Sequence, residues 1–270
     1  MDCLSPAEIT AKAEEVGYKK ATGKMGHTIV AGILAGMFIA IGAVFSLTSI
    51  AGLAAGHVPY GIIRFIAGLA FSLGLILVMV AGAELFTGNV MLVSSLLKKK
   101  ISWLQLFKNW TLIWLANFVG ALIVVALVYV GGWYTNGGIG DLAMTVGLHK
   151  LDYGFMQAIS LGILCNILVC LGVWLAWSGR STADKVLGII FPITAFVAGG
   201  FEHSVANMFY LPFAYVLKMG GVVAEGVDVS GLTLSNIFIH NLLPVTIGNI
   251  IGGAVFLSIA YRYLYSKKSA

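Results

Sequence analysis

The sequence predicts an all-α membrane protein in which six helices cross the bilayer and two of the six are interrupted. The prediction rests first on composition: 59% of the 270 residues are hydrophobic, only 10% are charged, and the mean hydropathy is +0.97. A soluble domain carries about 25% charged residues. The composition therefore excludes a soluble enzyme, a disordered protein and a nucleic-acid-binding module, and it makes membrane lipid the expected surroundings of the chain.

Six stretches are long and apolar enough to cross a membrane, since a spanning helix needs about 20 mostly apolar residues. They are residues 27–50, 62–97, 109–134, 155–178, 186–217 and 237–264. The second and fifth are too long for one straight crossing. We divide the chain into an N-terminal segment (1–26), a six-span domain (27–264, with halves at about 27–134 and 155–264) and a tail (265–270).

The basic residues predict the orientation of these spans. Of the 16 Lys and Arg residues, all but Arg64, Lys150 and Lys218 fall in segments that six crossings place on one face. Because basic residues collect on the cytoplasmic side of a membrane protein, we expect both termini in the cytoplasm and the spans in the plasma (inner) membrane.

The N-terminal segment predicts a short helix outside the membrane. Ser5 is a good N-cap, Pro6 suits the first helical position, and Glu8 completes a capping box. The segment has no apolar core of the kind found in signal peptides. Two interpretations stay open: a helix lying at the membrane interface, which the periodicity favours, and a cytoplasmic gate.

The two long spans carry matching interruptions. Each has glycine just before a glutamate, and an asparagine five residues after it: Glu84 and Asn89 in the second span, Glu202 and Asn207 in the fifth. Three spans per half is an odd number, so the second half must enter the membrane inverted. Interrupted helices at matching positions of two inverted halves indicate a substrate site near the midplane. The alternative is a pair of ordinary glycine kinks covered by neighbouring helices.

The ionisable residues favour the pore interpretation. Glu84, Glu202 and His203 are the clearly intramembrane ionisable residues, and all three lie in the interruptions. Such groups are costly in a membrane and are usually functional. Helices restarting near Thr87 and Ser204, both suitable N-cap types, would direct N–H groups at a small anion.

The two glutamates are expected to anchor their loops by accepting hydrogen bonds from backbone N–H groups. His203 could donate a hydrogen bond or a proton to an anion, or it could be a neutral histidine satisfied by Glu202 or a backbone carbonyl.

Further candidates each keep a structural alternative. Lys150 could attract anions to the mouth of a pore or be a solvated loop lysine. Asn166 and Asn249 could face a pore or bond another helix. Bulky residues of the interrupted spans could form dry constrictions or simply pack against neighbours: Phe71, Leu75 and Phe196, with Leu85 and Phe86 of the first interruption.

Several motifs resemble the formate/nitrite transporter family, and most of all its formate channels. They are residues 84–89 (ELFTGN), 200–209 (GFEHSVANMF) and 244–253 (PVTIGNIIGG), supported by 71–77 (FSLGLIL), 162–166 (GILCN) and 178–181 (SGRS). The resemblance runs through nearly the whole chain in order. One departure is Gly88-Asn89, where the formate branch has a hydroxyl-rich stretch after Thr87.

The resemblance implies an aquaporin-like 3+3 inverted fold, a homopentamer with one pore in each protomer, and passage of small monovalent anions such as formate with a proton. Thr87 would face the pore with His203 as its central partner, and the N-terminal helix would lie at the cytoplasmic mouth. Lys150 would be the vestibular lysine, with Asn166 as its neighbour. Asn249 would be the polar residue of the sixth span, and Phe71 would line the pore toward the outer vestibule. Leu75 and Phe196 would form the two hydrophobic constrictions.

Other functions stay open at this stage. Nitrite, hydrosulfide and short carboxylates are alternative substrates for the same fold, and a neutral-solute channel of aquaporin type shares the six spans. A haem-binding redox subunit is disfavoured because only one histidine lies deep in a span. Cys3, Cys165 and Cys170 have no metal-binding spacing. We expect no enzyme activity, metal or cofactor.

Overall fold

The computed structural model describes residues 3–223 and 226–265, and these residues contain helices and no strand. The α-helices are α1 (Pro6–Thr22), α2 (Met25–Ile50), α3 (Tyr60–Ala81), α4 (Phe86–Asn89), α5 (Val93–Leu97), α6 (Trp103–Val130), α7 (Ile139–Leu151), α8 (Phe155–Ser178), α9 (Thr182–Ala198), α10 (Ser204–Met219), α11 (Leu234–Asn236), α12 (Leu243–Ile251) and α13 (Ala260–Tyr265). Short 3₁₀ turns lie at Leu53–Gly56, Val90–Leu92 and Trp133–Thr135, and π-helical turns at Ile237–Leu242 and Gly252–Ile259. The all-α class predicted from the sequence is confirmed.

Within the described residues, five helical stretches are long and apolar enough to cross a membrane. They are α2, α3, α6, α8 and the continuous stretch Leu234–Tyr265. The remaining expected span, residues 186–217, is divided between α9 and α10, of 17 and 16 residues. Neither is long enough to cross alone, so the count of six crossings remains a prediction.

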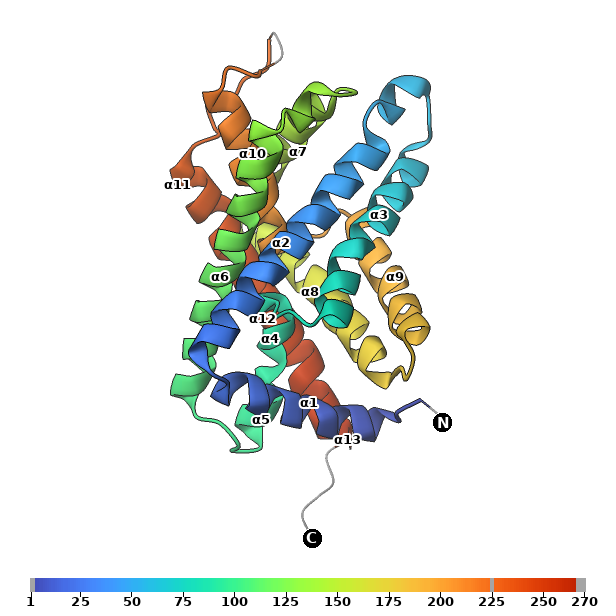
Figure 1. The fold of residues 1–270 in the computed structure, drawn as a ribbon, viewed down its shortest axis with the longest axis vertical. Helices are drawn as coiled ribbons and strands as arrows, with labels where there is room; N and C mark the ends of the chain where they lie inside the picture. Colours follow the sequence, from blue (N-terminus) through green and yellow to red (C-terminus); the bar gives the residue numbers. More distant parts are fainter. Residues whose placement is uncertain (1–2, 224–225, 266–270) are drawn as a thin grey trace.

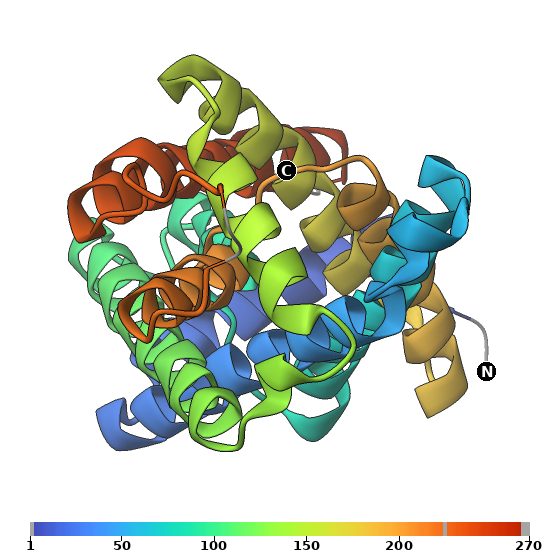
Figure 2. The same ribbon diagram turned by 90° about the horizontal axis from the view of Figure 1, so that it is seen from above.

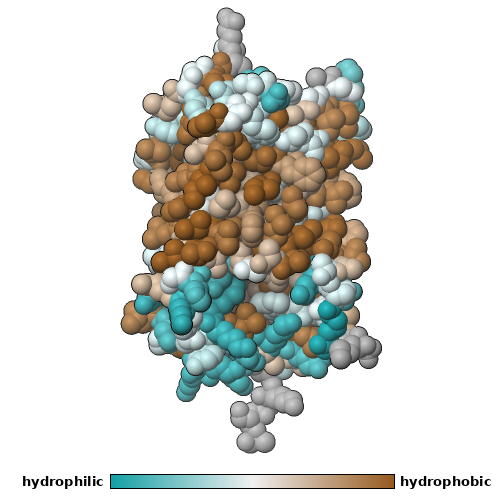
Figure 3. All heavy atoms as spheres, in the orientation of Figure 1, coloured by the Kyte–Doolittle hydropathy of each residue, from teal (hydrophilic) through white to brown (hydrophobic). Residues whose placement is uncertain are grey.

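The long helices run side by side between two polar ends. Figure 1 shows α1 lying across one end of the molecule, near α13, and α7 at the opposite end. Seen from above, the helices form one closely packed bundle (Figure 2). An apolar belt covers the middle of the visible face, and hydrophilic residues collect at the α1 end (Figure 3). This distribution is that of an integral membrane protein.

The N-terminal helix α1 is held firmly against its end of the bundle. Its capping box between Ser5 and Glu8 forms as expected. Ile9 and Ala13 are buried, and Glu14 accepts a hydrogen bond of 2.9 Å from Arg262. The predicted tail lies outside the described residues from position 266 onward.

Glycine allows α2 and α6 to approach closely. A Cβ on Gly36 would overlap the backbone carbonyl of Asn117, and a Cβ on Gly120 would overlap the carbonyl of Ile33. Backbone atoms cannot move aside as a flexible side chain can. Small residues at such contacts are the usual means by which membrane helices pack.

Gly120→Ala should therefore destabilise the protein by about 1–3 kcal/mol, the usual cost of overpacking. The measurement is the melting temperature of the detergent-solubilised protein. Gly26→Ala is the matched control, because a Cβ on Gly26 would meet nothing within 4 Å. Equal melting of the two variants would contradict this account of the packing.

Candidate functional site

Two chain interruptions face each other in the middle of the bundle. The first separates α3 from α4 and begins at Gly82, whose φ is 84°. The second separates α9 from α10 and contains Gly200, whose φ is 71°. Glycine takes these left-handed conformations without the steric cost that a Cβ brings. At both interruptions the backbone is then non-helical until the next helix begins.

Two buried asparagines satisfy the backbone at these interruptions. Asn117 of α6 accepts from the N–H of Phe86 (2.8 Å) and donates to the carbonyls of Gly32 (2.7 Å) and Glu84 (3.0 Å).

Asn249 of α12 makes the corresponding set. It accepts from the N–H of Ser204 (2.9 Å) and donates to the carbonyls of Gly162 (2.8 Å) and Glu202 (2.9 Å). All these bonds of the Asn249 side chain go to backbone groups. Asn249 is absent from the linings of the α7-side cavity (about 240 Å³) and of the α1-side cavity (about 160 Å³). Asn117 was missed from sequence, although it follows Asn109 by eight residues just as Asn249 follows Asn241.

The two glutamates are held by side chains. Glu84 accepts from Asn89 Nδ2 (2.9 Å), and Glu202 accepts from Asn207 Nδ2 (2.6 Å) and Asn241 Nδ2 (3.2 Å). The expectation that they bind backbone N–H groups was wrong. The backbone donors nearest the helix starts are already taken, at Phe86 and Ser204, by the two buried asparagines.

A lysine joins each of these networks. Lys150 Nζ lies 2.7 Å from Glu202 Oε1, and the lysine side chain is only 14% exposed. Lys20 Nζ donates to Asn89 Oδ1 (2.6 Å). Burial lowers the pKa of Lys20, and the nearby Glu84 carboxylate opposes that shift. Lys20 was also missed, because the sequence analysis counted it only among the basic residues that predict the orientation of the spans.

Thr87 and His203 meet between the two interruptions. Thr87 Oγ1 lies 2.9 Å from His203 Nε2, and His203 Nδ1 accepts from the N–H of Ala206 at 3.0 Å. His203 is thus the N-cap of α10, and Leu85 precedes α4. The expectation of N-cap bonds from Thr87 and Ser204 was wrong, since each lies inside the first turn of its helix.

Two side chains of α8 also hold the backbone of Thr87. Its carbonyl accepts from Asn166 Nδ2 (3.1 Å) and from Cys170 Sγ (3.3 Å). Asn166 Nδ2 further donates to the carbonyl of Asn249 at 2.6 Å. Asn166 therefore ties the first interruption to α12.

Two cavities approach this centre from opposite ends. The α7-side cavity has a volume of about 240 Å³, and its lining includes Phe71, Phe196, His203, Lys150 and Glu202. The α1-side cavity, of about 160 Å³, has a lining that includes Leu75, Leu85 and Lys20.

Two aromatic rings line the α7-side cavity beside His203. The rings of Phe71 and Phe196 lie 5.6 Å apart, and Phe196 stacks on His203 at 5.8 Å. Phe86 lines neither cavity and instead faces a lateral groove between α6 and α12.

We expect Asn249→Ala to lower the free energy of unfolding by at least about 2 kcal/mol, because it leaves buried backbone groups without partners. Thermal melting of the solubilised protein measures the effect. The exposed Asn136, whose side chain donates to the carbonyl of Trp133, gives the control Asn136→Ala. Wild-type melting of Asn249→Ala would show that this residue does not hold the interruption.

The described residues contain no group of three or more His, Cys, Asp or Glu side chains that could hold a metal ion. The site offers hydrogen bonding and charge through a threonine–histidine pair at the centre and a balanced lysine–glutamate pair in the α7-side cavity.

The chain is similar to known proteins over nearly its whole length. The family Formate/nitrite transporter matches residues 7–263. The formate channel FocA of Escherichia coli (strain K12) is 41% identical over 277 residues, covering 99% of this chain and 96% of that protein. FocA of Haemophilus influenzae is 38% identical, covering 97% and 94%. A solved structure described as a pentameric formate channel with formate bound has a TM-score of 0.80 at 40% identity, covering 92% and 99%. These relatives are membrane channels rather than enzymes, and this chain belongs to the formate/nitrite transporter family.

Proposed function

We propose that the chain conducts small monovalent anions, with formate as its principal substrate, through a pore in each protomer of a homopentamer. The named relatives support the substrate and the assembly: FocA is a formate channel, and the similar solved structure is a pentamer with formate bound. The single observation in this chain that carries the proposal is the Thr87–His203 hydrogen bond. His203 lines the α7-side cavity, and Leu85 and Gly88, on either side of Thr87 in the chain, line the α1-side cavity.

The proposed path is a filter against hydrated ions. An anion enters one cavity, loses water at the apolar rings of Phe71 and Phe196, and crosses past Leu75 to the other cavity. Apolar constrictions resist charged species. Burial also raises the proton affinity of a carboxylate, so the solute crosses most readily when a hydrogen bond or a proton reduces its charge at the centre.

The tautomer of His203 defines how it acts. Because Nδ1 accepts from the Ala206 N–H, we assign the proton of the neutral ring to Nε2, which then donates to Thr87 Oγ1. The Thr87 hydroxyl is left free to donate to the solute. A second proton, on Nδ1, would place the Nδ1–H group and the Ala206 N–H group in repulsive contact. Proton movement with the solute therefore requires the Ala206 bond to open.

The paired bonding also supports the 3+3 inverted architecture. Asn117 and Asn249 make matching sets of three bonds, and the Glu84–Asn89 and Glu202–Asn207 pairs match in spacing and contact. In this architecture α9 and α10 together form the fifth crossing, and residues 27–264 form one channel domain. Both termini lie in the cytoplasm of a cell whose inner membrane holds the protein.

The experiment that tests the function is uptake of labelled formate into proteoliposomes at two external pH values, with nitrite and hydrosulfide as competitors. Saturable formate uptake supports a formate channel. Strong nitrite or hydrosulfide flux without formate flux would move the protein to another branch of the family. Water or glycerol flux without anion flux would favour a neutral-solute channel.

His203→Asn should abolish the pH dependence of formate uptake and slow uptake at the lower pH about tenfold or more. Asparagine is a good N-cap and can accept from the Ala206 N–H, so the start of α10 is preserved while the titratable ring is lost. Uptake is measured beside the melting temperature, which should stay near the wild-type value. A variant that kept both the rate and the pH dependence would refute the proton role of His203.

We also propose that α1 gates the α1-side cavity, since Ala13, Gly17 and Lys20 line it. Deleting residues 1–22 should remove any closure of the channel at low pH, because the Lys20–Asn89 bond that holds α1 to the first interruption is lost. Uptake over a range of pH values measures the effect. Unchanged closure in the truncated protein would assign the gate elsewhere.

A further inference from the structure

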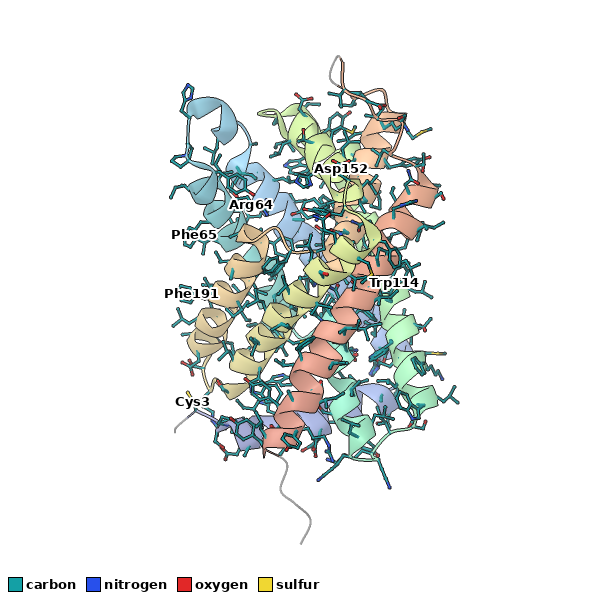
Figure 4. All side chains as sticks on the ribbon, turned by 180° about the vertical axis from the view of Figure 1, so that it is seen from behind. Cys3, Arg64, Phe65, Trp114, Asp152 and Phe191 are labelled. Carbon is teal, nitrogen blue, oxygen red and sulfur yellow. The ribbon has the colours of Figure 1, made fainter. Side chains whose placement is uncertain are left out.

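Arg64 lines the α7-side cavity from the first turns of α3. Figure 4 shows it toward the same end of the molecule as Asp152, above Phe65 and well away from Trp114. Its side chain is half-buried. The residue attracted no functional interpretation from the sequence, where it appeared only as one of three basic residues on the less basic face.

The guanidinium group is fixed at the end of α9. Nη2 donates to the carbonyl of Val197, and Nε donates to the carbonyl of Ala198 at 3.4 Å. Carbonyls at a helix C-terminus lack intrahelical partners and carry the negative end of the helix dipole. These two bonds use two of the five N–H donors of arginine. The remaining donors have no protein acceptor among the residues that the structure describes.

The charges of the cavity lining cancel except for the charge of Arg64. Lys150 and Glu202 lie 2.7 Å apart and largely neutralise each other. Within the described part of the chain, no carboxylate lies within 4.0 Å of Arg64. The net positive charge of this cavity therefore comes from Arg64, while the ammonium of Lys150 is already occupied.

We propose that Arg64 is the anion-docking residue of the α7-side cavity and that it favours anions with two oxygens in one plane. The inference rests on the proposed anion-channel function. A planar guanidinium offers parallel N–H donors that match a carboxylate, and an ammonium group acts as a point charge. Formate and nitrite present such an oxygen pair, and hydrosulfide does not. Tyr60 and Tyr153 line the same cavity.

The first test compares initial rates of formate uptake over a range of formate concentrations and ionic strengths. Arg64→Gln should raise the half-saturating formate concentration at least about threefold and weaken its dependence on ionic strength, because salt screens the attraction of a charge in solvent. Lys218→Gln is the matched control. Lys218 is another cation predicted for this face, but it bonds the carbonyls of Val229 and Leu232 and does not line the cavity.

Arg64→Lys separates charge from shape. It should keep most of the ionic-strength dependence and lose the preference for formate over hydrosulfide in competition. A variant that kept the wild-type preference would overturn the role of the planar group.

A chemical restoration of charge distinguishes docking from a purely structural effect on α9. Arg64→Cys is made in a Cys3→Ser background, which removes the exposed cysteine and leaves the buried Cys165 and Cys170. The assembled protein is then treated from outside with a cationic or an anionic methanethiosulfonate. The cationic reagent should lower the half-saturating formate concentration and the anionic reagent should raise it further.

Equal effects of the two reagents, or wild-type concentration and salt dependence in Arg64→Gln, would overturn the assignment alone. Absence of formate uptake by the wild-type protein would instead overturn the proposed function, and the assignment with it.

Discussion

The arrangement of this protein depends on one constraint, which is that backbone groups exposed by an interrupted helix must be hydrogen-bonded inside the bundle. Water is scarce at that depth, so an unsatisfied N–H or carbonyl costs several kcal/mol. Asn117 and Asn249 meet the constraint at the two interruptions, each with one accepted and two donated bonds. Irregular backbone can then persist in the centre, where a continuous helix would leave no donor or acceptor for a solute.

The central pair of polar side chains follows from that support. Thr87 is placed by the first interruption and by the bonds from Asn166 and Cys170 to its carbonyl. His203 is placed by the second interruption and by the N–H of Ala206. The groups that bond Thr87 and His203 are neutral. The adjoining aromatic side chains of Phe71 and Phe196 are apolar. A solute at this point meets hydrogen-bond donors without a fixed full charge.

Charge is instead kept in the cavities and largely balanced there. The carboxylate of Glu202 accepts from Lys150, Asn207 and Asn241, so its loop is anchored at little electrostatic cost. A buried carboxylate without such partners would be strongly unfavourable and would also repel an anion. The excess positive charge of the α7-side cavity lies on Arg64, whose guanidinium also caps the end of α9. In the proposed function, attraction, dehydration and hydrogen bonding thus occur at successive places along one path.

The sequence by itself determined the membrane class, the places of both interruptions and the family. Hydropathy is a local property, and the Glu–Asn spacing and the motifs around Thr87, His203 and Asn249 are contiguous in the chain. Only the tertiary structure decided the partners of those residues. Asn249 bonds backbone, the glutamates bind side chains, and His203 caps α10 itself. Lys20, Asn117 and Arg64 were not recognised beforehand, because their contacts join residues that lie 31 to 134 positions apart in the chain, and no local pattern encodes such a pairing.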